Sequence, residues 1–198
     1  DHGNMVYENS NFLDIENHNL KLLKINFNEI IRNLDLSEND NFSAHVITNF
    51  KNNKIPTRIK FGLNVGVNGL RSKLPCNICF NTHMGNPLLE NKLSSFHWAP
   101  MFHDRNTILT LGNFSTLKNY QRDANMELNF YRIEDSSNVV HNINLEPNSE
   151  KRVSLNDFDL DSFIKTEGWV TIKADNPYVH GYYFNLNSSG SVSGDHFF

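Results

Sequence analysis

Hydrophobic and polar residues alternate along much of this chain. The longest case is residues 55–67, where every second position is apolar or β-branched: Ile55, Thr57, Ile59, Phe61, Leu63, Val65 and Val67. A period of two is the spacing of a strand that buries one face. The pattern predicts a long half-buried strand here, with a bend at Gly62 or Gly66.

Shorter segments of the same type follow along the chain. They predict strands at Leu20–Phe27, Phe42–Phe50, Leu74–Phe80, Phe96–Phe102, Thr107–Leu111, Met126–Ile133, Val139–Leu145, Lys151–Leu155, Gly168–Ala174, Tyr178–Leu186 and Ser191–Phe198. The stretches 134–138, 146–149 and 175–177 between them are rich in turn-forming residues. Short turns between alternating strands indicate antiparallel sheets.

One segment has helical spacing instead. Phe27, Ile30, Ile31 and Leu34 recur at three- and four-residue intervals, which predicts one short helix near residues 27–35. We therefore expect an all-β protein: an antiparallel β-sandwich of one or two immunoglobulin-like or jelly-roll-like units with this single helix.

An internal duplication would explain a likeness between Lys24–Val46 and Arg152–Val170. Both segments read as strand, acidic turn, apolar helical turn, polar loop and strand. A chance likeness between two hairpins explains the pattern as well. The expected units are residues 1–110, with an incomplete N-terminal part, and residues 111–198, and the two can also pack as a single domain.

The last 75 or so residues resemble bacterial immunoglobulin-like or fibronectin-like modules. The resemblance is carried by ELNFYRIEDSSNVVHNINL, RVSL and GWVTIKADNPYVHGYYF. It implies a sandwich used for adhesion, spacing or assembly. Cys76 and Cys79 lie too close in sequence for the intersheet disulfide of antibody domains, which excludes that branch.

Composition narrows the classes of partner. The net charge of −4 offers no general attraction to nucleic acid or to an anionic membrane. No apolar stretch is long enough for a membrane span. The chain begins at Asp1 with no visible leader, so either a leader was removed or the chain is a fragment, and we expect a secreted or cell-surface protein. The 32 Asn residues reflect either an AT-rich genome or selection for turns and surface hydrogen bonds.

The two cysteines stand in a strand-like LPCNICF segment. Strand geometry sends Cys76 and Cys79 to opposite faces, so we expect two free thiols. A metal site with His83 as a third ligand, or a disulfide, remains the alternative.

Two histidine groups are candidate sites. His180, Asp195 and His196 could bind one divalent transition metal if the C-terminal strand folds back. However, His180 shares a strand face with Tyr178, Tyr182 and Phe184, so a core or interface histidine is the alternative. His97 and Trp98 form a candidate binding pair, since Trp98 and Phe96 could stack on a sugar ring or pack in a core.

These observations favour a non-enzymatic structural or binding module without a cofactor. We expect it in a cell-surface, extracellular or virion assembly, acting through sheet faces and edges. Expected partners are other copies of the chain, other surface proteins or carbohydrate. The alternative is a metal-dependent protein that binds or acts on carbohydrate through His180, Asp195 and His196.

Overall fold

The structure is a computed structural model of the 198-residue chain. It describes residues 7–9, 25–34, 44, 62–65, 76–79, 89–115, 117–188 and 191–198. The predicted strands at Leu20–Phe27 and Phe42–Phe50 lie largely outside these residues, as do most of 55–67 and His83.

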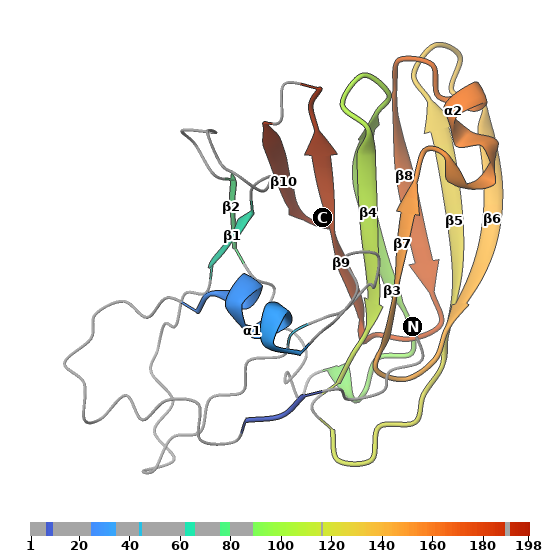
Figure 1. Ribbon diagram of the computed structural model, residues 1–198. Coiled ribbons are helices and arrows are strands. Elements are labelled where there is room, and N and C mark those ends of the chain that lie inside the picture. Colours follow the sequence, from blue (N-terminus) through green and yellow to red (C-terminus); the bar gives the residue numbers. More distant parts are fainter. Residues whose placement is uncertain are drawn as a thin grey trace.

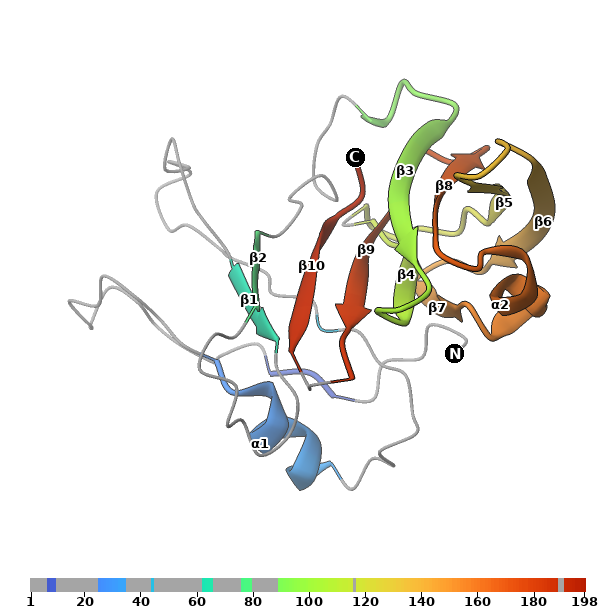
Figure 2. The same cartoon turned by 90° about the horizontal axis from the view of Figure 1, so that it is seen from above.

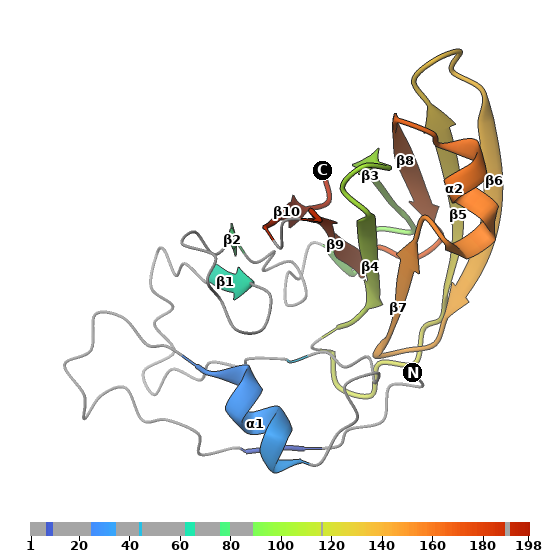
Figure 3. The ribbon, with the colours of Figure 1, turned by 45° about the horizontal axis from the view of Figure 1, so that its top comes forward.

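Eight strands form two four-stranded antiparallel sheets. The order is β3–β8–β5–β6 in the first, which we call the β5 sheet, and β10–β9–β4–β7 in the second, the β9 sheet. The strands are β3 (Ser95–Phe102), β4 (Thr107–Asn113), β5 (Ala124–Arg132), β6 (Asn138–Leu145), β7 (Ser149–Ser154), β8 (Glu167–Ala174), β9 (Val179–Leu186) and β10 (Val192–His196). The sheets are the two layers of a sandwich (Figure 1, Figure 3), so the predicted all-β antiparallel sandwich is confirmed.

The cysteine segment is a strand, as predicted. β2 (Cys76–Cys79) pairs antiparallel with β1 (Gly62–Val65), with Cys76 opposite Val65 and Cys79 opposite Gly62. This hairpin lies beside β10 (Figure 1).

The predicted short helix is also confirmed. α1 spans Phe27–Asn33, and none of its residues is buried. The side chain of Asn26 makes no capping bond to the helix backbone but donates to Glu29 Oε1 at 2.8 Å.

Alternation within each strand builds the core between the sheets. In β5, for example, Met126, Leu128 and Phe130 point inward while Asn125 and Glu127 point outward. The largest fully buried core side chains are Phe130, Met101, Leu109, Leu111, Met126, Leu128, Leu160, Ile164, Ile172, Val153 and Val170. Burying a side chain of this size contributes about 1.5–3 kcal/mol, so these positions hold the layers together.

The more apolar face of β9 does not belong to this core. Val179 is a core residue and Tyr183 packs against the core, whereas Tyr182 and Phe184 are half-buried on the opposite face. Gly181 explains the arrangement, because a Cβ there would clash with the Phe197 ring and the Thr110 carbonyl oxygen. The inner side of β9 is thus filled by a residue from the end of the chain.

The last two residues close one edge of the sandwich (Figure 2). The Phe197 N–H donates to the Gly181 carbonyl of the β9 sheet at 3.0 Å. The Phe198 N–H donates to the Trp98 carbonyl of the β5 sheet at 3.1 Å, and the Trp98 N–H donates back at 3.0 Å. Phe197 is only 5% exposed, so its ring also seals the gap.

A short helical segment covers the edge formed by β6 and β7 (Figure 1). It consists of a 3₁₀ turn, η4 (Asp157–Asp159), and α2 (Leu160–Phe163). Phe158 has a φ of 59°, which a bulky residue rarely adopts. Its ring stacks on His141 of β6 with centroids 4.4 Å apart, and this packing offsets the backbone cost.

A buried amide network fastens the connection from β4 to β5. The Asn113 amide group donates to the carbonyls of Arg122, Leu145 and Glu146 at 2.9–3.1 Å. Its Oδ1 accepts from the Tyr120 hydroxyl at 2.6 Å and from Asn176 Nδ2 at 3.2 Å. Burial is the main reason that the pKa of Tyr120 is raised above 10.0.

Asparagine supports the turns in this fold. Asn106, Asn119 and Asn148 have φ values of 41°, 60° and 59°, in the region that Asn tolerates better than most residues. The abundance of Asn therefore has a structural use, whatever its genomic cause.

The expected boundary between units, after residue 110, falls inside β4. Both sheets combine strands from the two sides of it: β3 pairs with β8, and β4 pairs with β7 and β9. Most of Lys24–Val46 lies outside the described residues, so the internal duplication stays a prediction.

Candidate binding surface

The outer face of the β5 sheet carries the strand positions that alternate with the core. Strand register places these side chains in three rows across β3, β8, β5 and β6. The rows are Phe96–Lys173–Glu127–Asn142, Trp98–Thr171–Asn129–Val140 and Pro100–Trp169–Tyr131–Asn138.

The β3 end of this face is aromatic and exposed. Phe96 is 57% exposed and Trp98 is 43% exposed, although both are large apolar side chains. Trp98 stacks on Phe198 with ring centroids 4.8 Å apart and an interplanar angle of 28°. The backbone bonds between the same two residues fix the position of the tryptophan.

A second aromatic pair lies in the next row. Tyr131 and Trp169 are opposite each other on β5 and β8, and their rings stack at 5.2 Å with an angle of 10°. Both are half-buried, so part of each ring remains accessible.

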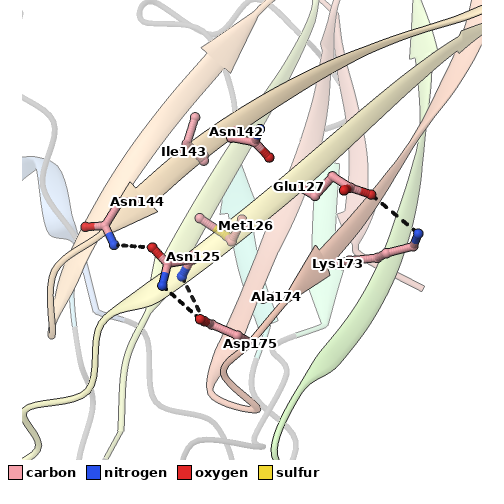
Figure 4. A pocket seen from close by; sticks show the side chains of 9 residues that line it. All are labelled: Asn125, Met126, Glu127, Asn142, Ile143, Asn144, Lys173, Ala174 and Asp175. Atoms are coloured by element: carbon pink, nitrogen blue, oxygen red, sulfur yellow. Dashed lines mark hydrogen bonds and ion pairs between the residues drawn. The ribbon is translucent and has the colours of Figure 1, made fainter.

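The β5–β6 end of the face is polar and hollowed (Figure 4). The hollow has a volume of about 460 Å³, and the outward side chains at its wall are Asn125, Glu127, Asn142, Asn144, Lys173 and Asp175. The Asn144 amide group donates to Asn125 Oδ1 at 2.9 Å. The Asn142 side chain has no hydrogen-bond partner among the residues that the structure describes.

The charges around the hollow are compensated locally. Lys173 Nζ lies 3.4 Å from Glu127 Oε1, and hydrogen bonds from Asn129 and Lys173 lower the pKa of that glutamate. Asp175 accepts from the Asn125 backbone N–H at 2.9 Å and from its side-chain amide at 2.8 Å. The Asn125 side-chain bond is the main cause that lowers the pKa of Asp175. Both carboxylates are therefore ionised acceptors at neutral pH.

Such a face offers contacts for a bound ligand. It offers apolar ring surface at one end and amide donors and acceptors at the other. The hollow is open and shallow, unlike an enclosed, water-excluding active site.

The structure separates the predicted pair His97 and Trp98. They are adjacent in β3, so they point to opposite sides of the sheet, and only Trp98 belongs to the outer face. The His97 Nε2 atom lies 3.0 Å from the carbonyl oxygen of Val179 in the other sheet. His97 thus helps to join the layers.

The three predicted metal ligands do not come together as one site. Asp195 Oδ1 lies 3.5 Å from His196 Nδ1. His180, by contrast, is opposite Gly112 on β4, and the centroid of its ring lies 5.4 Å from that of Phe114. The His180 Nδ1 atom lies 3.1 Å from the Tyr178 carbonyl oxygen. Within the described residues, no group of three or more His, Cys, Asp or Glu side chains could hold a metal ion.

Sequence reasoning missed the polar half of the outer face. Its signal was present, since Glu127, Asn142 and Asn144 occupy outward positions of predicted strands and Asn125 directly precedes one of them. What sequence could not supply was the pairing of β5 with β6 and β8 that collects them.

No protein-family description matches the chain, and no curated protein matches it. A crystal structure of Thermotoga maritima 1070 aligns with a TM-score of 0.40 and 14% sequence identity, covering 52% of this chain and 91% of that one. A likeness of this degree carries no argument about function. No helix in the described part of the chain is long and apolar enough to cross a membrane.

Proposed function

We propose that this chain is a non-enzymatic binding module that acts through the outer face of the β5 sheet. The observation that carries the proposal is the exposure of Phe96 and Trp98 beside a polar hollow on the same face. Contiguous exposed apolar surface marks interaction sites, and aromatic residues such as Trp carry much of the binding energy at interfaces.

The proposed setting is a cell-surface, extracellular or virion assembly, where the partner is another component of that surface. The sandwich architecture and the resemblance of the last 75 or so residues to immunoglobulin-like or fibronectin-like modules support this setting, and kinship with those modules is part of the proposal. No observation favours the metal-dependent alternative, because His180, Asp195 and His196 do not form a group of three side chains that could hold a metal ion.

The test blocks the centre of the face. Thr171 lies between Trp98 and Asn129 in the middle row, and Thr171→Arg would place a long charged side chain there. Asn156→Arg adds the same charge at an exposed turn before η4, where the Asn156 side chain makes no capping bond. It is the matched control.

The measurement is binding of labelled protein to the envelope or particle fraction of the organism that encodes it. We expect the original protein and Asn156→Arg to bind equally and Thr171→Arg to bind at least tenfold more weakly. Equal binding by Thr171→Arg, or no binding by the original protein, would show that the module does not act through this face.

A further inference from the structure

We propose that the ligand of this face is a neutral glycan chain that lies across the strands, from Phe96 and Trp98 on β3 to the hollow at β5 and β6. This inference rests on the proposed function and names the chemistry of its ligand.

The aromatic end matches the apolar side of a sugar. A pyranose ring presents C–H groups on its faces, and these pack on an exposed aromatic ring. Trp98 is held by two backbone hydrogen bonds and by the Phe198 ring, so binding need not order it. A preorganised contact of this kind loses little conformational entropy when the ligand arrives.

The polar end matches sugar hydroxyls. A hydroxyl is both a donor and an acceptor, and so is a carboxamide. Asn142 has no partner within the described part of the chain, and the bond from Asn144 to Asn125 leaves the Asn144 oxygen available. The carboxylates of Glu127 and Asp175 add acceptors at the same hollow.

Charge argues for a neutral ligand. Lys173 is the cation at the hollow, and it is paired with Glu127. Asp175 adds a further negative charge beside it. The other cation near Asp175 is Arg122, whose guanidinium donates to the backbone carbonyls of Leu93 and Asp175. A sulfated, phosphorylated or uronic-acid polymer would meet this carboxylate beside cations that already have partners.

The same residues argue against a protein partner. The centre of a protein interface is depleted in charged side chains and is mostly apolar. Here the centre of the Phe96 row is the Lys173–Glu127 pair, and the hollow beyond it adds amide groups and the Asp175 carboxylate to its apolar lining. Docking an apolar protein surface on this row would remove both charges from water.

The length of the row points to a chain rather than a single sugar. Phe96 and Asn142 are separated by three interstrand steps. At about 4.8 Å per step the row spans about 14 Å, which is longer than one sugar ring.

The test is affinity electrophoresis of the folded protein in gels that contain hydroxyethylcellulose, xyloglucan, glucomannan, galactomannan or dextran, with polygalacturonate as the anionic comparison. The variants are Phe96→Ala, Trp98→Ala and Asn142→Ala, with Asn156→Ala as the control. Phe96 and Asn142 are exposed, so their removal leaves the fold intact, and thermal melts check Trp98→Ala.

We expect at least one neutral polysaccharide to retard the original protein and Asn156→Ala equally. The dissociation constant should rise at least tenfold in both aromatic variants and severalfold in Asn142→Ala. The inference is overturned if no neutral polysaccharide in the panel retards the protein, if polygalacturonate binds better, or if folded variants bind like the original.

The envelope experiment separates this inference from the function on which it rests. Suppose that Thr171→Arg abolishes binding, that protease treatment of the envelope also removes it, and that excess polysaccharide does not compete with it. The ligand would then be a protein. The face would then still be the binding surface, and only the glycan would be wrong. Binding that is insensitive to Thr171→Arg would end both.

Discussion

Trp98 and Phe198 are joined by two backbone hydrogen bonds, of 3.0 and 3.1 Å, and by stacked rings 4.8 Å apart. Trp98 lies on β3, the edge strand of the β5 sheet. Phe198 follows β10 of the β9 sheet by two residues. The preceding residue, Phe197, fills the space above Gly181. The end of the chain thus closes the sandwich and holds a proposed binding residue in place.

This closure predicts unequal roles for the two terminal phenylalanines. Phe197→Ala should lower the free energy of unfolding by about 3–5 kcal/mol, because it empties a buried site. Phe198→Ala should cost only about 0.5–1.5 kcal/mol, the contribution of an aromatic contact. Urea unfolding measures both, and equal losses would contradict the assignment.

The buried amide network predicts that one asparagine matters far more than another. Asn113→Ala removes the acceptor of the Tyr120 hydroxyl and one donor from each of three backbone carbonyls, and should cost about 2 kcal/mol or more. Asn142→Ala, on the outer face, should stay within about 0.5 kcal/mol of the original. Chemical denaturation of the two variants side by side tests this, and a similar loss in both would contradict it.

Tyr120 predicts a loss of stability in alkali. Its folded-state pKa is raised above the ordinary value of 10.0, chiefly by burial, so the neutral phenol is favoured in the fold. Its contribution is complete below pH 10 and is lost as the pH rises through the folded-state pKa. Tyr120→Phe should be less stable at neutral pH but should lose less stability between pH 9 and about 11.5. Parallel slopes for the two proteins would contradict this expectation.

Asp135 predicts a loss of stability in acid. Arg132 donates to it twice, at 2.6 and 2.7 Å, and these bonds are the main reason that its pKa is far below 3.8. The contribution of Asp135 is complete above the unfolded-state pKa and is lost as the pH falls towards the folded-state value. Asp135→Asn should therefore flatten the pH dependence of unfolding below about pH 4.

Arg132→Gln provides the companion to that experiment, because it removes the same two bonds from the other side. The double variant should show little additional change beyond either single variant. Additive effects would mean that the two side chains do not act as a pair.

Local sequence was sufficient to predict most elements of this fold. Strands from Phe96–Phe102 onward were predicted within one or two residues of β3–β10, and the helix near 27–35 is α1. The reason is that period-two alternation and turn residues are properties of neighbouring positions. The same local rule already implies that His97 and Trp98 point apart.

Sequence did not predict features that depend on contacts between residues far apart in the chain. The alternate positions of β9 that carry most of its aromatic residues do not face the core. The core side of β9 is the side of Gly181, where the Phe197 ring occupies the space that a side chain would take. His180 was grouped with Asp195 and His196 because the C-terminal strand was expected to fold back, and β10 does pair with β9. Asp195 and His196 are opposite Tyr183 and Tyr182 rather than His180, and the three do not form a group that could hold a metal ion. The polar hollow likewise required the pairing of β5 with β6 and β8.

The amino-acid sequence by itself determined the class of fold, because alternation of apolar and polar side chains fixes which residues must leave water. Tertiary structure alone decided which of two faces each strand buries, how the chain end closes the sandwich and which outward side chains meet. Those outcomes depend on strand order and register, which are set by packing between segments far apart in the chain.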